Sequence, residues 1–300
     1  MSETGRPATP LFDTVAFIGI GHIASSLALA LRRHGLVRRM VATARHQETL
    51  DVALRLGTVD EATTDIGKAV AEADLVMICV PVGACGQVAA AAAPFLKPGA
   101  IVSDVGSVKR AVIRDVVPAL PAGTPFVPGH PLAGTEFSGP ESGVVDLFEN
   151  RWVVLTPLAE TPKPATDRVA AMWRAVGASV DLMDPGHHDQ TLAITSHLPH
   201  LIAYTIVGTA ADLATDLKQE VIKYSASGFR DFTRIAASDP VMWRDIFLNN
   251  REAVLSTLQR FTEDLTAMQR AIRKGEGDFL EKSFVRTRAI RRGIIDARQA

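Results

Sequence analysis

The fold is decided by ten residues near the N-terminus, which read Val15-Ala16-Phe17-Ile18-Gly19-Ile20-Gly21-His22-Ile23-Ala24. An apolar run typical of a buried strand is followed by a glycine turn and then by a helical pattern. Gly19, Gly21 and Ala24 occupy the three small positions of the pattern G-x-G-x-x-G/A. The first permits the turn, the second lets a pyrophosphate approach the backbone, and the third keeps helix and strand close. The stretch therefore predicts a dinucleotide-binding loop, in which free N–H groups of a helix N-terminus bind phosphate.

Short apolar runs alternate with longer helical patterns on either side of this loop. Strands are expected at residues 15–18, 40–43, 75–80, 100–104, 126–128, 152–156 and 179–183, and helices at 23–34 and 167–176, among others. Strands separated by single helices form βαβ units. The sequence therefore predicts an α/β fold with a doubly wound, mostly parallel sheet.

The pattern changes after Asp184-Pro185-Gly186, where we expect a domain boundary. We expect a disordered tail at residues 1–12, a dinucleotide-binding domain at 13–185 and a helical domain at 186–300. Residues 192–211 are apolar on nearly every face, which predicts a buried helix, and Pro199 is expected to kink it. A later apolar seam consists of Val254, Leu258, Phe261, Leu265, Met268 and Ile272. Packing within the chain explains part of this seam, but so thin a helical domain favours a homodimer through the C-terminal helices.

Charge and composition exclude several classes of partner. Lys and Arg number 32 against 33 Asp and Glu in 300 residues, a net charge of −1 that gives no reason to expect nucleic acid or a membrane surface. Apolar runs fall well short of the roughly 20 residues of a membrane span, and the N-terminus lacks a signal peptide's apolar core. Two cysteines are too few for a zinc site. We expect a cytoplasmic protein without a metal.

The residues leave the choice between NAD and NADP nearly balanced. NAD enzymes of this fold usually carry an acidic residue at the end of the second strand, which bonds the ribose 2′-hydroxyl. Here that stretch is Ala42-Thr43-Ala44-Arg45-His46. A 2′-phosphate held by Arg45 and Thr43 slightly favours NADP, whereas an Arg45 facing solvent is compatible with NAD. The candidate cofactor-binding residues are Gly19, Gly21, His22, Ile23, Ala24, Thr43, Arg45, Val80, Pro81 and Ser107.

Two polar residues lie in loops after expected strands, at the sheet edge where open α/β folds bind ligands. Ser107 lies just before an expected helix, where its simplest role is that of an N-cap. His130 lies between Gly129 and Pro131, with little core to pack against. That position suits a general base beside a nicotinamide, although the residues alone are equally compatible with a structural histidine.

Three longer segments carry a resemblance to a known family. They are residues 129–139, the run Thr195-Ser196-His197-Leu198-Pro199-His200, and residues 229–236 together with 239–245. These segments resemble the prephenate/arogenate (cyclohexadienyl) dehydrogenase family, and the likeness extends over about residues 13–295. The resemblance implies a Rossmann domain followed by an all-α dimerisation domain. It also implies oxidative decarboxylation of prephenate to 4-hydroxyphenylpyruvate, or of arogenate to tyrosine, with hydride transfer to NAD(P)+.

The resemblance further implies roles for individual residues. His130 matches the catalytic histidine that takes the proton of the substrate's C4 hydroxyl, and Ser107 matches a serine that bonds the same hydroxyl. Arg234 matches the arginine that binds a substrate carboxylate with its planar guanidinium. His197 matches a histidine of the substrate pocket, whereas His200 is expected to be structural. The other matched pocket residues are Thr135, Glu136, which we expect to be tied to Arg234 or to a neighbouring subunit, and Trp243.

Some features depart from the family pattern or leave alternatives open. Ala24 replaces a common glycine, and His22 replaces an apolar residue and is expected to face solvent. One alternative is a two-domain dehydrogenase of the β-hydroxyacid or imine-reducing type, but the expected lysine is absent between Thr191 and Leu217. Another is a catalytically silent dinucleotide sensor, which predicts loss of the catalytic set. Prephenate and arogenate are not distinguished by the sequence, and a broad cyclohexadienyl specificity is our default expectation.

Overall fold

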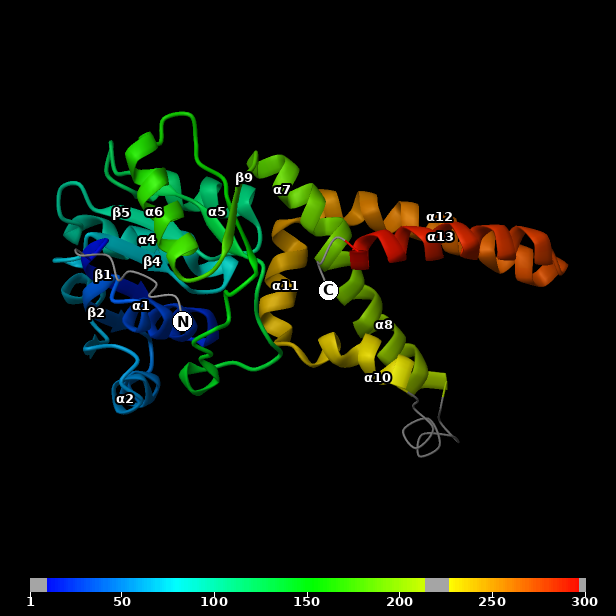
Figure 1. The fold of residues 1–300 in the computed structure, drawn as a ribbon, viewed down its shortest axis with the longest axis horizontal. Coiled ribbons are helices and arrows are strands. Elements are labelled where there is room, and N and C mark those ends of the chain that lie inside the picture. Colours follow the sequence, from blue (N-terminus) through cyan, green and yellow to red (C-terminus); the bar gives the residue numbers. More distant parts are fainter. Residues whose placement is uncertain (1–9, 214–226, 297–300) are drawn as a thin grey trace, which may run out of the picture. The chain divides into compact units, whose positions relative to one another are not determined.

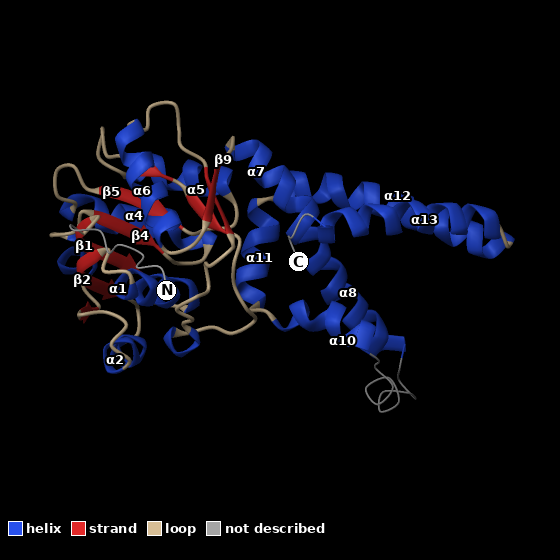
Figure 2. Cartoon of the chain, in the orientation of Figure 1, coloured by secondary structure: helices blue, strands red, loops and turns tan. Residues whose placement is uncertain are grey.

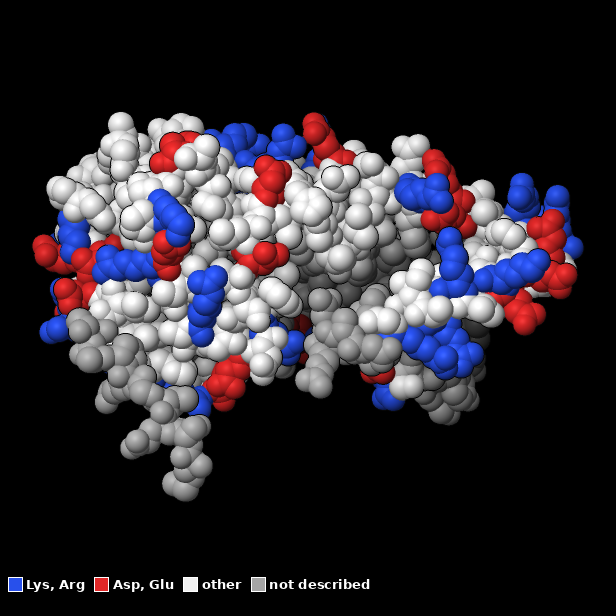
Figure 3. Space-filling view, turned by 45° about the horizontal axis from the view of Figure 1, so that its top comes forward, with Lys and Arg blue, Asp and Glu red and all other residues white. Residues whose placement is uncertain are grey.

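The computed structural model describes residues 10–213 and 227–296. The chain divides into a larger unit, residues 1–251, and a smaller unit, residues 252–300. In the part of the chain that is described, no helix has the length and apolar character needed to cross a membrane. Lys and Arg side chains are interspersed with Asp and Glu on the face drawn in Figure 3, in line with the balanced charge.

The larger unit is built on a parallel sheet in the order β3-β2-β1-β4-β5-β6 (Figure 1). The strands are β1 (Phe12–Ile18), β2 (Val37–Thr43), β3 (Glu61–Thr63), β4 (Leu75–Ile78), β5 (Ile101–Asp104) and β6 (Phe126–Val127). Because β1 and β4 are neighbours, the strand order reverses between them. Open α/β sheets bind dinucleotides at such a switch point, outside the carboxyl ends of the strands.

Both faces of this sheet are covered by helices (Figure 2). Side chains alternate along a strand, so Val15 and Phe17 of β1 join one core and Ala16 and Ile18 the other. The first core is completed by α1 (His22–Arg33), α2 (Gln47–Arg55) and α6 (Lys163–Ala175). The second is completed by α3 (Ile66–Val70), α4 (Cys85–Ala92) and α5 (Lys109–Val116). The predicted doubly wound arrangement is therefore confirmed.

Two of the expected strands belong to a second, mixed sheet. Strand β8 (Trp152–Leu155) pairs parallel to β9 (Ser179–Leu182) and antiparallel to β7 (Gly129–Pro131), a short strand that the sequence did not predict. The β7 residue His130 pairs with Val154. His130, which the sequence places in a loop, is thus held by strand pairing.

After Asp184 the described part of the larger unit, residues 185–213 and 227–251, is mainly helical. Its segments are α7 (Pro185–Leu192), a π-helical turn (Ala193–His197), α8 (Leu198–Leu213), α10 (Ser227–Thr233), a 3₁₀ turn (Arg234–Ala237) and α11 (Pro240–Asn249). The π turn stands just before Pro199, which has no N–H to donate to the carbonyl four residues earlier. The expectation of one buried helix is wrong, since Ile206 and Val207 of α8 are 39% and 40% exposed.

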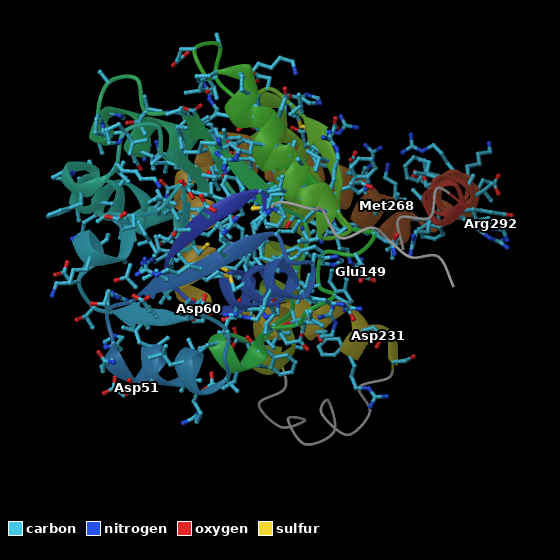
Figure 4. All side chains as sticks on the ribbon, turned by 60° about the vertical axis from the view of Figure 1, so that its left-hand side comes forward. Asp51, Asp60, Glu149, Asp231, Met268 and Arg292 are labelled. Atoms are coloured by element: carbon cyan, nitrogen blue, oxygen red, sulfur yellow. The ribbon has the colours of Figure 1, made fainter. Side chains whose placement is uncertain are left out.

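The smaller unit consists of the main part of α12 (Arg251–Lys274) and of α13 (Gly277–Asp296). Met268 on α12 and Arg292 on α13 are labelled in Figure 4. The apolar seam of α12 is only partly covered, because Val254 is buried while Leu265 and Ile272 are 56% and 68% exposed. At the other end of the chain, Phe12 was expected in the tail but is a buried residue of β1, and residues 1–9 lie outside the described range.

Candidate active site

The glycine loop after β1 has the geometry of a pyrophosphate cradle. Gly19 adopts φ +92°, and a Cβ there would lie 2.5 Å from the carbonyl oxygen of Cys79, so only glycine fits. A Cβ on Gly21 would meet no described atom within 4 Å. Gly21 is also the N-cap of α1, whose first turn carries no acidic residue and no side-chain cap among the described residues. Open space before free N–H groups fits a dinucleotide pyrophosphate.

His22, which we expected to face solvent, is 8% exposed. Its Nδ1–H donates to the carbonyl oxygen of Ser142 at 2.7 Å, so the side chain ties α1 to the turn Pro140–Ser142. The same turn is held by Ser26, whose Oγ accepts from the N–H of Val144. Packing of this loop on α1 explains why the side chain is buried. His22 Nε2 is buried and has no hydrogen-bond partner within the described part of the chain.

The other candidate cofactor residues surround the switch point. Thr43 is buried, and its carbonyl oxygen accepts from the N–H of Gly19 at 2.8 Å. Arg45 lies exposed two residues beyond β2 and forms no ion pair with the described residues. Val80 follows β4 against Gly19, and Ile23 of α1 approaches Gly134, so the loop after His130 lies beside the cofactor loop.

A buried ion pair holds the backbone just before His130. Lys109 Nζ, which is fully buried, donates to Asp104 Oδ2 and to the carbonyl oxygen of Gly129. The N–H of Gly129 in turn donates to Asp104 Oδ1 at 3.1 Å. Both backbone groups of Gly129 are therefore bound, and the paired charges satisfy each other where an unpaired charge would be costly. Neither Asp104 nor Lys109 was predicted as a site residue.

The imidazole of His130 is linked to a second histidine. His130 Nδ1 lies 2.9 Å from His188 Nε2, and His188 Nδ1 lies 2.8 Å from Asp189 Oδ1. Burial lowers the pKa of His130 well below its ordinary value, and His188, Lys109 and His197 add to the effect. Burial also lowers the pKa of His188, partly offset by Asp189. His130 is therefore uncharged near neutral pH.

His197 ends the π turn and is fully buried. Its Nδ1 accepts from Asn250 Nδ2 at 3.1 Å, and the same amide donates to the carbonyl oxygen of Asp189 at 2.8 Å. The proton of His197 is therefore on Nε2, which has no partner among the described residues. Burial lowers the pKa of His197 to about 4, so it presents a neutral donor. His200 stacks on Trp243 with ring centroids 3.7 Å apart.

Ser107 is not the cap of α5. The N-cap position is Val108, and the N–H groups of Lys109 and Arg110 are bound by the carboxylate of Asp189 at 2.7 and 2.9 Å. The hydroxyl of Ser107 makes no hydrogen bond to any described residue. It is half-buried in the loop after β5 and is free to bind a ligand.

Arg234 and Glu136 form an ion pair at 2.9 Å within one chain. Their side chains are 59% and 26% exposed. Thr135 is also exposed, and its Oγ1 accepts from the N–H of Phe137. Trp243 of α11 is 6% exposed and packs with the second core of the parallel sheet.

The fold thus brings together residues that are far apart in the sequence, and it adds polar residues that sequence reasoning missed. These are Asp104, Lys109, His188, Asp189 and Asn250. Two features of the sequence could have pointed to them: Asp104 and Lys109 lie on either side of Ser107, and His188 and Asp189 directly follow the expected domain boundary.

A dinucleotide loop at the switch point and an uncharged histidine in the adjoining segment define an NAD(P)-dependent dehydrogenase.

Comparison with known proteins identifies the family. The family models described as the nucleotide-binding domain and the dimerization domain of prephenate dehydrogenase match residues 27–182 and 184–286. A cyclohexadienyl dehydrogenase of Zymomonas mobilis is 43% identical over 91% of this chain and 93% of its own. A Bacillus subtilis prephenate dehydrogenase is 31% identical over 94% of this chain and 76% of its own.

A solved structure supports the same assignment. The prephenate dehydrogenase of Aquifex aeolicus, in complex with hydroxyphenyl propionate and NAD+, has a TM-score of 0.87 and 36% identity, covering 94% of this chain and 98% of its own. This chain belongs to the prephenate dehydrogenase family. Membership confirms the resemblance stated above and decides against the β-hydroxyacid and imine-reducing alternatives.

Proposed function

We propose that this chain oxidatively decarboxylates both prephenate and arogenate. Hydride leaves C4 of the cyclohexadienol ring, the ring carboxylate leaves as CO₂, and the electron pair of the broken C–C bond makes the ring aromatic. The C4 hydroxyl loses its proton as hydride departs and regains it as the phenol forms, so no net proton is released. When bound, NAD(P)+ supplies the hydride acceptor.

The observation that carries this proposal is the position of the His130 imidazole, which is bonded to His188 in the segment beside the cofactor loop. Its Nδ1 is engaged by His188, which leaves Nε2 for the substrate hydroxyl. A neutral imidazole accepts a proton, and general bases of this kind contribute about 10²- to 10⁴-fold to rates. The half-buried hydroxyl of Ser107 is proposed to bond the same substrate oxygen.

Arg234 is proposed to bind a substrate carboxylate. Its present partner is Glu136, but an exposed ion pair contributes only about 0–1 kcal/mol, so a substrate carboxylate is able to displace it. His197 Nε2–H offers a second, uncharged donor to the substrate. Thr135 and Trp243 are proposed to complete the pocket.

We propose a slight preference for NADP+. Arg45 is exposed beyond the end of β2, at the position where a 2′-phosphate is expected, and Thr43 precedes it. The stretch 43–47 contains no carboxylate to repel the phosphate.

We also propose a homodimer through the C-terminal helices, with the boundary between the dinucleotide-binding and helical domains at residue 185. Support comes from the family's dimerization domain, matched at residues 184–286, and from exposed apolar side chains in the smaller unit. They include Leu265 and Ile272 of α12 and Phe284, Val285 and Ile290 of α13, all more than half exposed. So many exposed apolar side chains mark an interaction surface.

Turnover of the purified protein with each substrate and each cofactor tests the proposal. We expect reduced cofactor to form with both prephenate and arogenate, accompanied by 4-hydroxyphenylpyruvate and tyrosine respectively. Turnover of one substrate alone would contradict the broad specificity, and turnover of neither would contradict the function. A higher kcat/KM with NAD+ would contradict the cofactor preference.

A further inference from the structure

A chain of polar contacts runs behind His130, away from the nitrogen proposed to meet substrate. His130 Nδ1, His188 Nε2, His188 Nδ1 and Asp189 Oδ1 are joined by contacts of 2.9 and 2.8 Å. His188 is fully buried and Asp189 is 3% exposed, so neither side chain is positioned to touch bulk water.

The positions of the protons along these contacts follow from the carboxylate of Asp189, at which the contacts end. A carboxylate only accepts, so His188 Nδ1 carries the proton that it donates to Asp189. His188 is uncharged because burial lowers its pKa, and its Nε2 is therefore an acceptor. His130 must then donate through Nδ1–H, which leaves its Nε2 unprotonated. The contacts select the one neutral tautomer in which His130 is able to act as a base at Nε2.

Asp189 is itself fixed in place. Its carboxylate oxygens accept from the N–H groups of Lys109 and Arg110 at the start of α5, and its carbonyl oxygen accepts from Asn250. A helix N-terminus stabilises a negative charge. The carboxylate is thus oriented before any substrate arrives, as a group that orients a catalytic histidine must be.

We propose that His188 is the positioning residue for the base His130, fixing its Nδ1–H tautomer and sharing the positive charge that forms on it. This inference rests on the proposed function. As hydride leaves, the C4 hydroxyl proton moves to His130 Nε2, and the Nδ1 proton shifts towards His188 Nε2 while Asp189 stabilises the cation. After CO₂ is lost, the same protons return and the phenol oxygen recovers its own.

The other charged and titratable groups nearby are bonded to other partners and do not position His130. Lys109 Nζ is engaged by Asp104 and by the carbonyl oxygen of Gly129. His197 Nδ1 accepts from Asn250, so it is not a link in this chain. His188 is the side chain that bonds Nδ1 of His130 in the described structure.

Two substitutions separate positioning from mere packing. His188→Leu removes the acceptor, whereas His188→Gln offers an amide oxygen near the position of Nε2. We expect kcat to fall about 100-fold in H188L and only about tenfold in H188Q, with KM and cofactor Kd changed by less than about threefold in both. His187→Leu is the matched control, because His187 is the exposed neighbour, and its kcat should equal that of the wild type.

The tautomer is measurable without turnover. In wild-type protein labelled with ¹⁵N-histidine, we expect His130 to be protonated on Nδ1 and unprotonated on Nε2. In H188L we expect the proton of His130 to shift towards Nε2. The proposal is overturned if wild-type His130 carries its proton on Nε2, if H188L keeps more than a third of the wild-type kcat, or if H188Q is no better than H188L. Wild-type protein that turns over neither substrate contradicts the proposed function instead, while the ¹⁵N spectrum still decides the tautomer.

Discussion

Arg234 has an exposed partner in Glu136 and an expected second partner in the substrate carboxylate. Arg234→Gln removes a charge-assisted contact made in both the ground state and the transition state, so KM should rise about 10- to 100-fold with a smaller change in kcat. Steady-state kinetics with prephenate measure both constants. Arg230→Gln, on the exposed surface of α10, is the control. An unchanged KM in folded R234Q protein would make Arg234 structural.

Arg45 decides the cofactor preference if it meets a 2′-phosphate. Arg45→Asp should lower kcat/KM for NADP+ and spare or raise it for NAD+, because the new carboxylate repels the phosphate and accepts the ribose 2′-hydroxyl. Both cofactors are compared at saturating substrate, with Arg55→Asp at the exposed end of α2 as the control. NADP+ kinetics that do not respond to R45D would show that Arg45 points to solvent.

At the residue scale, motifs predicted the candidate site residues but not the side chains that support them. His130, Ser107 and Arg234 lie in distinctive segments, and their surroundings in the structure suit the expected roles. The contacts of His130 with His188, and of Lys109 with Asp104 and Gly129, depend on how separate elements pack. Hydropathy patterns do not encode such contacts. For the same reason the burial of His22 against Ser142 was not foreseen.

At the scale of the element, the glycine loop allows a sharp comparison. Gly19→Ala places a Cβ against Cys79 at positive φ, and should lower the free energy of unfolding by about 1–3 kcal/mol. Gly21→Ala meets no described atom and should leave the stability of the free protein nearly unchanged, yet fill the space expected for pyrophosphate. Both variants should bind cofactor more weakly.

Thermal unfolding and cofactor titration distinguish the two glycine variants. Retention of wild-type cofactor affinity by G21A would contradict the proposed cradle, because its Cβ would then occupy space that the dinucleotide does not need. A G19A protein as stable as the wild type would contradict the backbone argument for the first glycine.

Strands with long apolar runs were predictable, and all seven expected strands are present. The short strands β3 and β7 were not, because three residues carry no usable alternation and β7 is formed through its pairing with β8. Pro199 predicted an irregular helix, but the structure has a π turn that ends at His197 rather than a simple kink. The two differ in the register of their backbone hydrogen bonds, which hydropathy does not report.

At the scale of the whole molecule, the apolar seam of α12 predicts self-association. Leu265→Asp together with Ile272→Asp places two charges on exposed apolar positions and should convert a dimer into a monomer without unfolding the helices. Sedimentation equilibrium measures the mass. Ser256→Asp, on the opposite face of α12 by helical periodicity, is the control and should stay dimeric. A wild-type monomer, or a dimer that survives both charges, would contradict the proposed interface.

In the proposed mechanism the whole reaction depends on the uncharged imidazole of His130, and His130→Asn tests that dependence most directly. The amide retains a hydrogen bond but does not take a proton, so kcat with prephenate should fall about 10²- to 10⁴-fold while cofactor affinity is unchanged. Wild-type activity should also decline as the pH falls through the pKa of His130, which burial holds below its ordinary 6.5, and H130N should lack this decline. An H130N enzyme that keeps more than a third of the wild-type kcat at neutral pH would contradict the account.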